Sequence, residues 1–174
     1  MIYLKTYFYV DHELQFLAAN LSEAYDHIDG FIICEFNRTH TGRARHLIGY
    51  EYLKERLPAD KLDKVMYIPC DMSSLAVEAY NNEDAIHDVN EPIMRSAFMK
   101  LMQLRDEDII VSVDADEIIY GDMYPKIVDA VERDGLCQLN LHQFFYKKNY
   151  LWKDKDFIAP TAIKYKYITY IWVT

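Results

Sequence analysis

The stretch Ile109-Ile110-Val111-Ser112-Val113-Asp114-Ala115-Asp116-Glu117 joins the most apolar short run of this chain to three acidic residues. The apolar part predicts a buried strand, because charged residues bound it on both sides. Such a strand brings clustered carboxylates to one edge of a sheet, where they repel one another unless a cation neutralises them. Hard divalent ions favour oxygen ligands, and open α/β sheets bind ligands outside the carboxyl ends of their strands. The stretch therefore predicts a metal-assisted site for a phosphate-bearing ligand.

Strand-like and helix-like segments alternate on both sides of this stretch. Strands are predicted at 2–10, 31–36, 65–68, 109–113, 136–145 and 163–173. Helices are predicted at about 12–25, 46–57, 90–104 and 124–133, with Asp11 capping the first, Pro92 in the first turn of the third and Gly135 ending the fourth. This alternation predicts an α/β fold with a mainly parallel sheet flanked by helices. No linker or repeat divides the 174 residues, so we expect a single domain.

Charge and cysteine content limit the possible partners and locations. The net charge of −9 argues against a nucleic-acid partner, although Arg38, Arg43, Arg45 and His46 form one local basic cluster. The three cysteines lack metal-ligand spacing, which favours free thiols and a cytoplasmic location. No run suggests a signal peptide or a membrane segment. The last residues, 170–174, include no polar tail, so we expect the sequence to be truncated relative to a longer protein.

The acidic residues after the apolar run form a D-x-D pair, Asp114 and Asp116. In an extended segment residues i and i+2 lie on the same side, so both carboxylates are predicted to face one metal ion. The alternative is a solvated turn. Glu117 either orients a ligand from behind this pair or is merely exposed.

Several segments together resemble glycosyltransferase family 17. They are I-I-V-S-V-D-A-D-E-I at 109–118, F-I-I-C-E-F-N-R-T-H-T-G at 31–42, E-L-x-x-L at 13–17, E-x-x-x-R at 91–95 and an aromatic stretch at 144–152. The best-known members of the family are the β-1,4-mannosyl-glycoprotein N-acetylglucosaminyltransferases. The resemblance covers about 2–152 and implies a GT-A-type fold, a nucleotide-sugar donor of UDP type, a divalent cation (usually Mn²⁺, otherwise Mg²⁺) and inverting transfer to a glycan acceptor. Full-length members continue past the last residue of this chain.

The resemblance also implies where the donor binds. Asp116 is expected at the cation, and Asp114 either there or at the ribose hydroxyls. Donor contacts are expected from Glu35, Thr39, His40, Thr41, Gly42, Arg95 and Asp114. Glu35 could instead pair with a nearby arginine, residues 39–42 could form a plain polar turn, and Arg95 could pair with Glu91. No residue is assigned as the catalytic base.

A polar row is predicted on the segment that begins at Cys137. Alternation places Gln138, Asn140 and His142 on one side of a strand that we expect to be central in the sheet. His142 is therefore a candidate for metal or sugar binding, with a structural, hydrogen-bonded histidine as the alternative. The aromatic residues at 144–146 and Trp152 are candidates for stacking on a sugar or a base, or for core packing.

Two other functions agree with parts of the pattern. A Mg²⁺-dependent phosphoryl-transfer or nuclease domain of TOPRIM type also combines a strand-end glutamate with a later D-x-D, but the glycine expected after Glu35 is absent. A domain that binds a nucleotide sugar without transferring it is the non-catalytic alternative.

Overall fold

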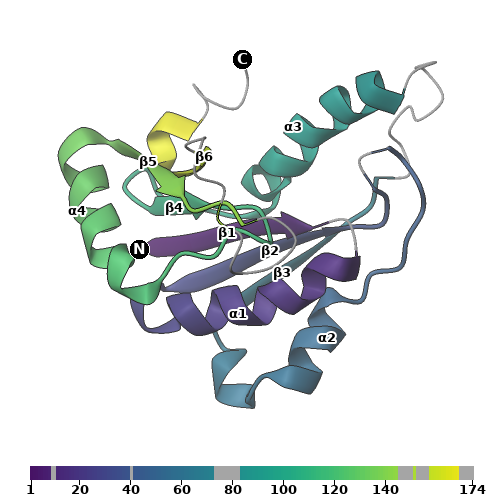
Figure 1. Ribbon diagram of the computed structural model, residues 1–174, viewed down its shortest axis with the longest axis horizontal. Helices are drawn as coiled ribbons and strands as arrows, with labels where there is room; N and C mark the ends of the chain where they lie inside the picture. The colour runs from purple at the N-terminus through teal and green to yellow at the C-terminus, as the bar shows by residue number, and fades with distance from the viewer. Residues whose placement is uncertain (9–10, 40, 73–82, 145–150, 152–156, 169–174) are drawn as a thin grey trace.

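The computed structural model describes residues 1–8, 11–39, 41–72, 83–144, 151 and 157–168, and for 83–88 and 157–159 the backbone alone. The described residues form a six-stranded sheet in the order β3-β2-β1-β4-β6-β5 (Figure 1). The strands are β1 (Ile2–Phe8), β2 (Gly30–Phe36), β3 (Val65–Cys70), β4 (Ile109–Ser112), β5 (Leu136–Leu141) and β6 (Phe157–Lys164). The helices are α1 (Leu14–Ala24), α2 (Gly49–Arg56), α3 (Glu83–Leu101) and α4 (Tyr124–Asp134). Within this part of the chain, none of the helices has the length and apolarity needed to span a membrane.

Helices cover both faces of the sheet, and the alternation of side chains along the strands supplies two cores. On β1, Leu4 packs with residues of α1, α2 and α4, whereas Tyr3 and Tyr7 pack with residues of α3. Figure 1 shows α1 and α2 on one side of the strands and α3 on the other. All seven residues of β2 are buried, as expected for a strand covered on both faces.

The order of the strands creates a switch point between β1 and β4. The chain runs from β1 through α1 to β2 and through α2 to β3, moving outward on one side of β1. It then returns through α3 to form β4, which pairs in parallel with the other side of β1. Ligands of open α/β sheets bind at such a reversal, outside the carboxyl ends of the strands. A ligand of this sheet is therefore expected at the edge beyond the carboxyl ends of β1 and β4.

The fold class predicted from the sequence is confirmed. β1, β2, β3 and β4 are mutually parallel along the sheet, and only β6 runs against its neighbours β4 and β5. Two stop signals were also correct: β2 begins at Gly30, and Gly135 ends α4 with a left-handed φ of 83°.

Four local predictions were wrong. α3 begins at Glu83, so Pro92 lies inside the helix and not in its first turn. The first helix has no side-chain cap, because Asp11 belongs to a short 3-10 turn before α1. β3 continues through Pro69, which an edge strand tolerates. The strand predicted to begin at residue 163 is instead β6, which begins at Phe157 and ends at Lys164, because the next residues form a 3-10 turn whose backbone donates to the loop before β4. The remainder of that prediction, 169–173, lies outside the described residues.

Candidate functional site

The acidic turn, residues Asp114 to Glu117, follows β4 at the carboxyl edge of the sheet, beside β1. The backbone N–H of Val113 donates to the carbonyl of Lys5 at 3.0 Å, which extends the pairing with β1 past the end of β4. The chain then turns at Ala115 and Asp116, so the extended geometry predicted for the D-x-D pair is wrong. Ala115 is buried and its carbonyl accepts a hydrogen bond from the Asn20 amide of α1 at 2.8 Å, while Asp116 is exposed. The turn is thus anchored to the body of the protein and presents Asp116 to solvent.

Arg95 on α3 holds the carboxylate of Asp114 in a two-pronged ion pair. Its Nη1 lies 2.7 Å from Asp114 Oδ1 and its Nη2 lies 3.1 Å from Oδ2. The same guanidinium donates to Glu91 Oε1 through Nε at 2.8 Å and Nη2 at 2.7 Å. It lies 4.9 Å from the centre of the Tyr7 ring, and about a third of its surface remains exposed. Arg95 therefore makes the pair with Glu91 that the sequence left open as an alternative, and it also reaches the acidic turn. A contact between Arg95 and the donor stays a prediction.

Glu117 fixes the acidic turn from inside. Its Oε2 accepts the backbone N–H of Asp114 at 2.7 Å, and its own N–H donates to the Asp114 carbonyl at 3.0 Å. Only 7% of the residue is exposed, so the alternative of an exposed Glu117 is wrong. Burial raises the pKa of Glu117 to about 7, and the charges of Asp114 and Asp116 add to the rise. The other oxygen, Oε1, is buried and has no hydrogen-bond partner among the described residues.

A fully buried lysine, Lys5 of β1, lies on the face of the sheet that α3 covers. Lys5 extends from β1 toward Ser112, whose hydroxyl is 3.5 Å from the ammonium, and the ammonium is 5.6 Å from the centre of the Phe98 ring. Burial lowers the pKa of Lys5 to about 8, although the carboxylates of Asp114 and Glu117 oppose this change. Lys5 therefore brings a second positive charge close to the acidic turn.

The charges around the acidic turn fit a divalent cation. In the described ranges, Arg95 pairs with Glu91 and Asp114, while Lys5 lies near Asp114 and Glu117. Asp116 adds a fourth carboxylate beside Glu117, so these four acids and two cations carry two net negative charges when all are ionised. Among the described residues, no three His, Cys, Asp or Glu side chains converge to hold a metal ion by themselves. Mg²⁺ in proteins is commonly held by one or two carboxylates together with substrate phosphates, and Mn²⁺ takes similar oxygen ligands. The carboxylate oxygens of the acidic turn thus suit a cation that binds together with a phosphate-bearing ligand.

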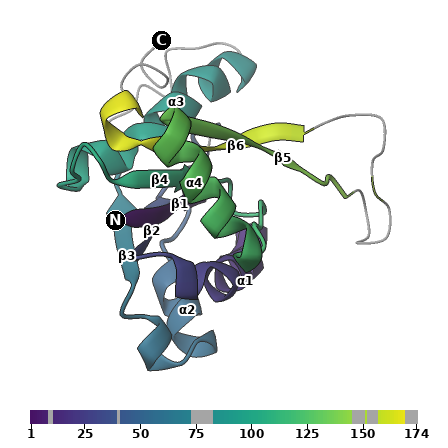
Figure 2. The same cartoon turned by 90° about the vertical axis from the view of Figure 1, so that its left-hand side faces the viewer.

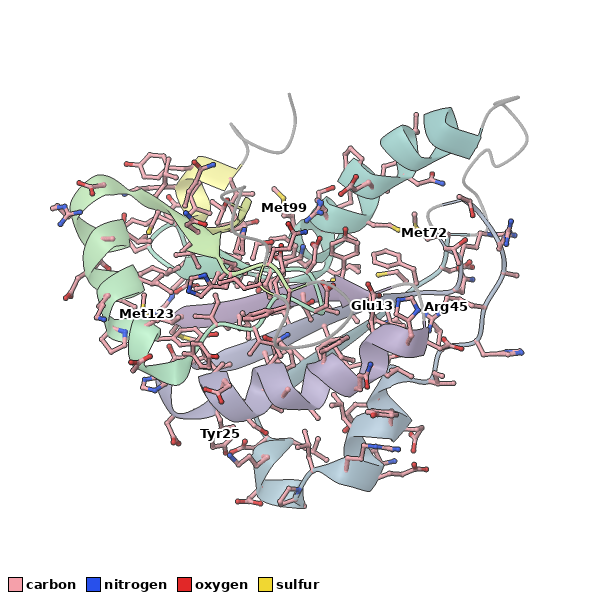
Figure 3. The ribbon with its side chains drawn as sticks, in the orientation of Figure 1. Glu13, Tyr25, Arg45, Met72, Met99 and Met123 are labelled. Atoms are coloured by element: carbon pink, nitrogen blue, oxygen red, sulfur yellow. The ribbon has the colours of Figure 1, made fainter. Side chains whose placement is uncertain are left out.

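Glu35 has a structural role, which is the alternative that the sequence left open for it. It ends β2 fully buried, and Arg45 Nη2 donates to its Oε1 at 3.1 Å. Its oxygens also accept the backbone N–H groups of Ile48 and Gly49, each at 2.8 Å, and the Tyr67 hydroxyl at 2.6 Å. The carboxylate therefore caps the start of α2 and has four donors within the protein. Figure 3 shows Arg45 beside the start of α1, where it also pairs with Asp11 at 2.8 Å.

The segment after Glu35 forms a compact polar turn. Thr39 accepts the backbone N–H of Arg43 at its hydroxyl (3.1 Å), and its carbonyl accepts the N–H of Gly42 (2.9 Å). The hydroxyls of Thr39 and Thr41 lie 3.2 Å apart, and Gly42 has a φ of 82° that favours glycine. These contacts explain why Thr39, Thr41 and Gly42 suit a tight turn. A contact between these residues and the nucleotide-sugar donor stays a prediction. His40 lies outside the described residues.

Comparison with known proteins identifies the family. The sequence profile of glycosyltransferase family 17 matches residues 7–172. The chain belongs to glycosyltransferase family 17. A search of curated proteins finds no match. Among solved structures, one similar chain is described as "Crystal structure of 4-diphosphocytidyl-2C-methyl-D-erythritol synthase"; it is 6% identical, with a TM-score of 0.48, over 95% of this chain and 74% of that chain.

His142 of this family 17 glycosyltransferase does not join the acidic turn. β6 lies between β4 and β5, so β5 is an edge strand and the prediction that it is central is wrong. Gln138, Asn140 and His142 are all exposed, which confirms the alternation but places the row on an open side. Figure 2 shows β5 and β6 extending away from the other strands. Phe144 is exposed 6.5 Å from the His142 ring, whereas Phe145, Tyr146 and Trp152 lie outside the described residues.

Sequence reasoning missed Lys5, Tyr7 and Asn20, which the fold brings to the acidic turn. Lys5 gave a signal, because a charged residue inside a strand that is otherwise apolar on both faces must be compensated in the core. Asn20 gave a similar signal on the buried side of α1. Neither signal names a partner, since both contacts join segments far apart in the chain.

Proposed function

We propose that this glycosyltransferase transfers a sugar, with inversion, from a UDP-type nucleotide-sugar donor to a glycan acceptor in a reaction that needs Mn²⁺ or Mg²⁺. The observation that supports the proposal is an acidic turn at the switch point of the sheet in a family 17 chain, in which Asp114 pairs with Arg95 and Asp116 is exposed. N-acetylglucosamine is the donor sugar that the family resemblance implies, so it is the first sugar to test.

We assign Asp116 to the cation because its carboxylate is exposed and has no partner among the described residues. Asp114 holds Arg95 beside the acidic turn, and it is also the candidate for the ribose hydroxyls. A guanidinium is suited to phosphate oxygens because its planar fork donates two parallel hydrogen bonds. When bound, the cation would stabilise the negative charge that develops on the leaving diphosphate.

The nuclease alternative needs a strand-end glutamate at the metal. Glu35 is instead buried and hydrogen-bonded to four donors, so it does not supply this ligand. The net charge of −9 also opposes binding to phosphate backbones. Both observations favour sugar transfer over nucleic-acid cleavage.

Thermal unfolding with UDP and a panel of UDP-sugars, with and without Mn²⁺, tests the proposal. We expect Mn²⁺-dependent stabilisation that Asp116→Asn abolishes. The matched control is Asp122→Asn, which removes the same charge from an exposed residue in the 3-10 turn before α4. Absence of stabilisation by every UDP ligand would refute the donor class. Stabilisation without release of UDP from any UDP-sugar would identify a domain that binds the donor without transferring it.

A further inference from the structure

Glu117 is a buried carboxylate that is incompletely compensated by the protein. It is 7% exposed, its Oε2 has one backbone donor, and its Oε1 has no partner within the part of the chain that the structure describes. Leaving a buried charged oxygen without a hydrogen bond is unfavourable, and unsatisfied groups of this kind are rare in native proteins. The residue also lies beside two further acids in the same turn, whose charges repel its own.

The hydrogen bond to Asp114 does not require a glutamate. The same geometry is met by a glutamine, whose amide oxygen accepts the Asp114 N–H and whose amide nitrogen replaces the unpartnered oxygen without a charge. The arrangement resembles half of a helix capping box, in which a Glu or Gln three residues on bonds back to the first residue. The hydrogen bond therefore does not explain the carboxylate, because a neutral amide would cost less to bury than a charged group. The charge of Glu117 requires another explanation.

The side chains around Glu117 suggest why a negative charge is present there. The reciprocal bonds between Asp114 and Glu117 set the shape of the turn that presents Asp116 to solvent. Glu117 holds the N–H of Asp114, the carboxylate of Asp114 is paired with Arg95, and Asp116 is the neighbour of Glu117 in the chain, so a negative charge on Glu117 lies within this group of side chains. A divalent cation at this turn would offset the repulsion among the carboxylates. The buried charge of Glu117 would therefore be favourable only when the cation is bound.

We propose that Glu117 is a positioning residue of the cation site, one that lowers the stability of the free protein and strengthens binding of the cation that accompanies the nucleotide. This inference rests on the proposed function, because it requires a cation at the acidic turn. It assigns to Glu117 two separable tasks: its Oε2 holds the turn, and its negative charge attracts the cation.

Calorimetric titration of UDP into the protein, once with Mn²⁺ and once with EDTA, measures the contribution of the cation as the ratio of the two affinities. We expect Glu117→Gln to reduce this ratio by about 10- to 100-fold, the usual effect of altering the groups behind metal ligands. The affinity in EDTA is expected to stay unchanged. The urea midpoint of Glu117→Gln without Mn²⁺ is expected to equal or exceed that of the wild type.

Two further variants make the result specific. Glu55→Gln makes the same chemical change at an exposed position on α2 and should leave the ratio and the midpoint unchanged. Glu117→Asp keeps the charge on a shorter side chain, so it should retain more of the ratio than Glu117→Gln but unfold at lower urea. A wild-type ratio in Glu117→Gln, or a lower urea midpoint for that variant, would overturn the inference and leave the proposed function intact. A wild type without any Mn²⁺ effect would refute the cation requirement itself.

Discussion

Replacing Glu35 with alanine decides whether this motif residue serves the fold or the donor. The change would leave four groups without their acceptor: the Arg45 guanidinium, the Tyr67 hydroxyl and the N–H groups of Ile48 and Gly49. Breaking one side of a buried ion pair costs about 3–5 kcal/mol. We therefore expect Glu35→Ala to lower the free energy of unfolding by about 4 kcal/mol.

Glu35→Gln should be milder, because the amide oxygen still accepts hydrogen bonds at the start of α2. Loss of the charge weakens the bond from Arg45, and a bond to a charged group is worth about 1.5–3 kcal/mol, so we expect a loss of about 2 kcal/mol. Urea unfolding followed by circular dichroism measures both values. Glu51→Ala, an exposed change on the same helix, is the control and should leave the midpoint where it is.

The opposite pattern would refute this reasoning. If Glu35→Ala unfolded at the wild-type urea concentration and yet lost the stabilisation by UDP and Mn²⁺, then Glu35 would be a donor contact. The hydrogen bonds described above would then contribute little to the fold.

Three other substitutions test separate parts of the structure. Lys5→Met should raise the free energy of unfolding at pH 7 by up to about 3 kcal/mol, because the pKa of Lys5 falls from 10.5 to about 8 on burial. The gain in stability of Lys5→Met over the wild type should shrink between pH 8 and 10.5 in urea titrations, because in this range Lys5 loses its proton in the folded wild type before it does so in the unfolded chain. A Lys5→Met variant that is less stable than the wild type at pH 7 would show that the ammonium stabilises the fold. Gly49→Ala should lower stability by about 2 kcal/mol in the same assay, because the new Cβ would lie 2.4 Å from Cζ of Phe8; an unchanged midpoint would contradict this packing. Arg95→Lys should weaken Mn²⁺-dependent UDP binding by about tenfold in calorimetry, since an ammonium cannot hold both oxygens of Asp114; equal affinity would exclude Arg95 from the site.

Local signals predicted much of the fold. The continuous apolar run before Asp114 and the stops at Gly30 and Gly135 placed strands and a helix within a few residues. These signals were reliable because they depend on backbone conformation and on burial within a single element. The same locality explains why acidic residues could be expected at the carboxyl end of this buried strand, although the turn that they form was not predicted.

Pairing between distant segments was not available from local patterns. Arg95 and Asp114 are held together by the return of the chain through α3, and Glu35 meets α2 only because the loop folds back over the end of β2. The edge position of β5, which places His142 on an open side, follows from the insertion of β6 beside β4.

The sequence by itself determined the α/β class, the family and the presence of acidic residues at the end of a buried strand, because periodicity, turn residues and motif spacing are properties of short segments. Tertiary structure alone decided which carboxylates are buried, which are paired and which one faces solvent. The reason is that the energy of a charged side chain depends on its desolvation and on its neighbours in space, and both are fixed only when the whole sheet has assembled.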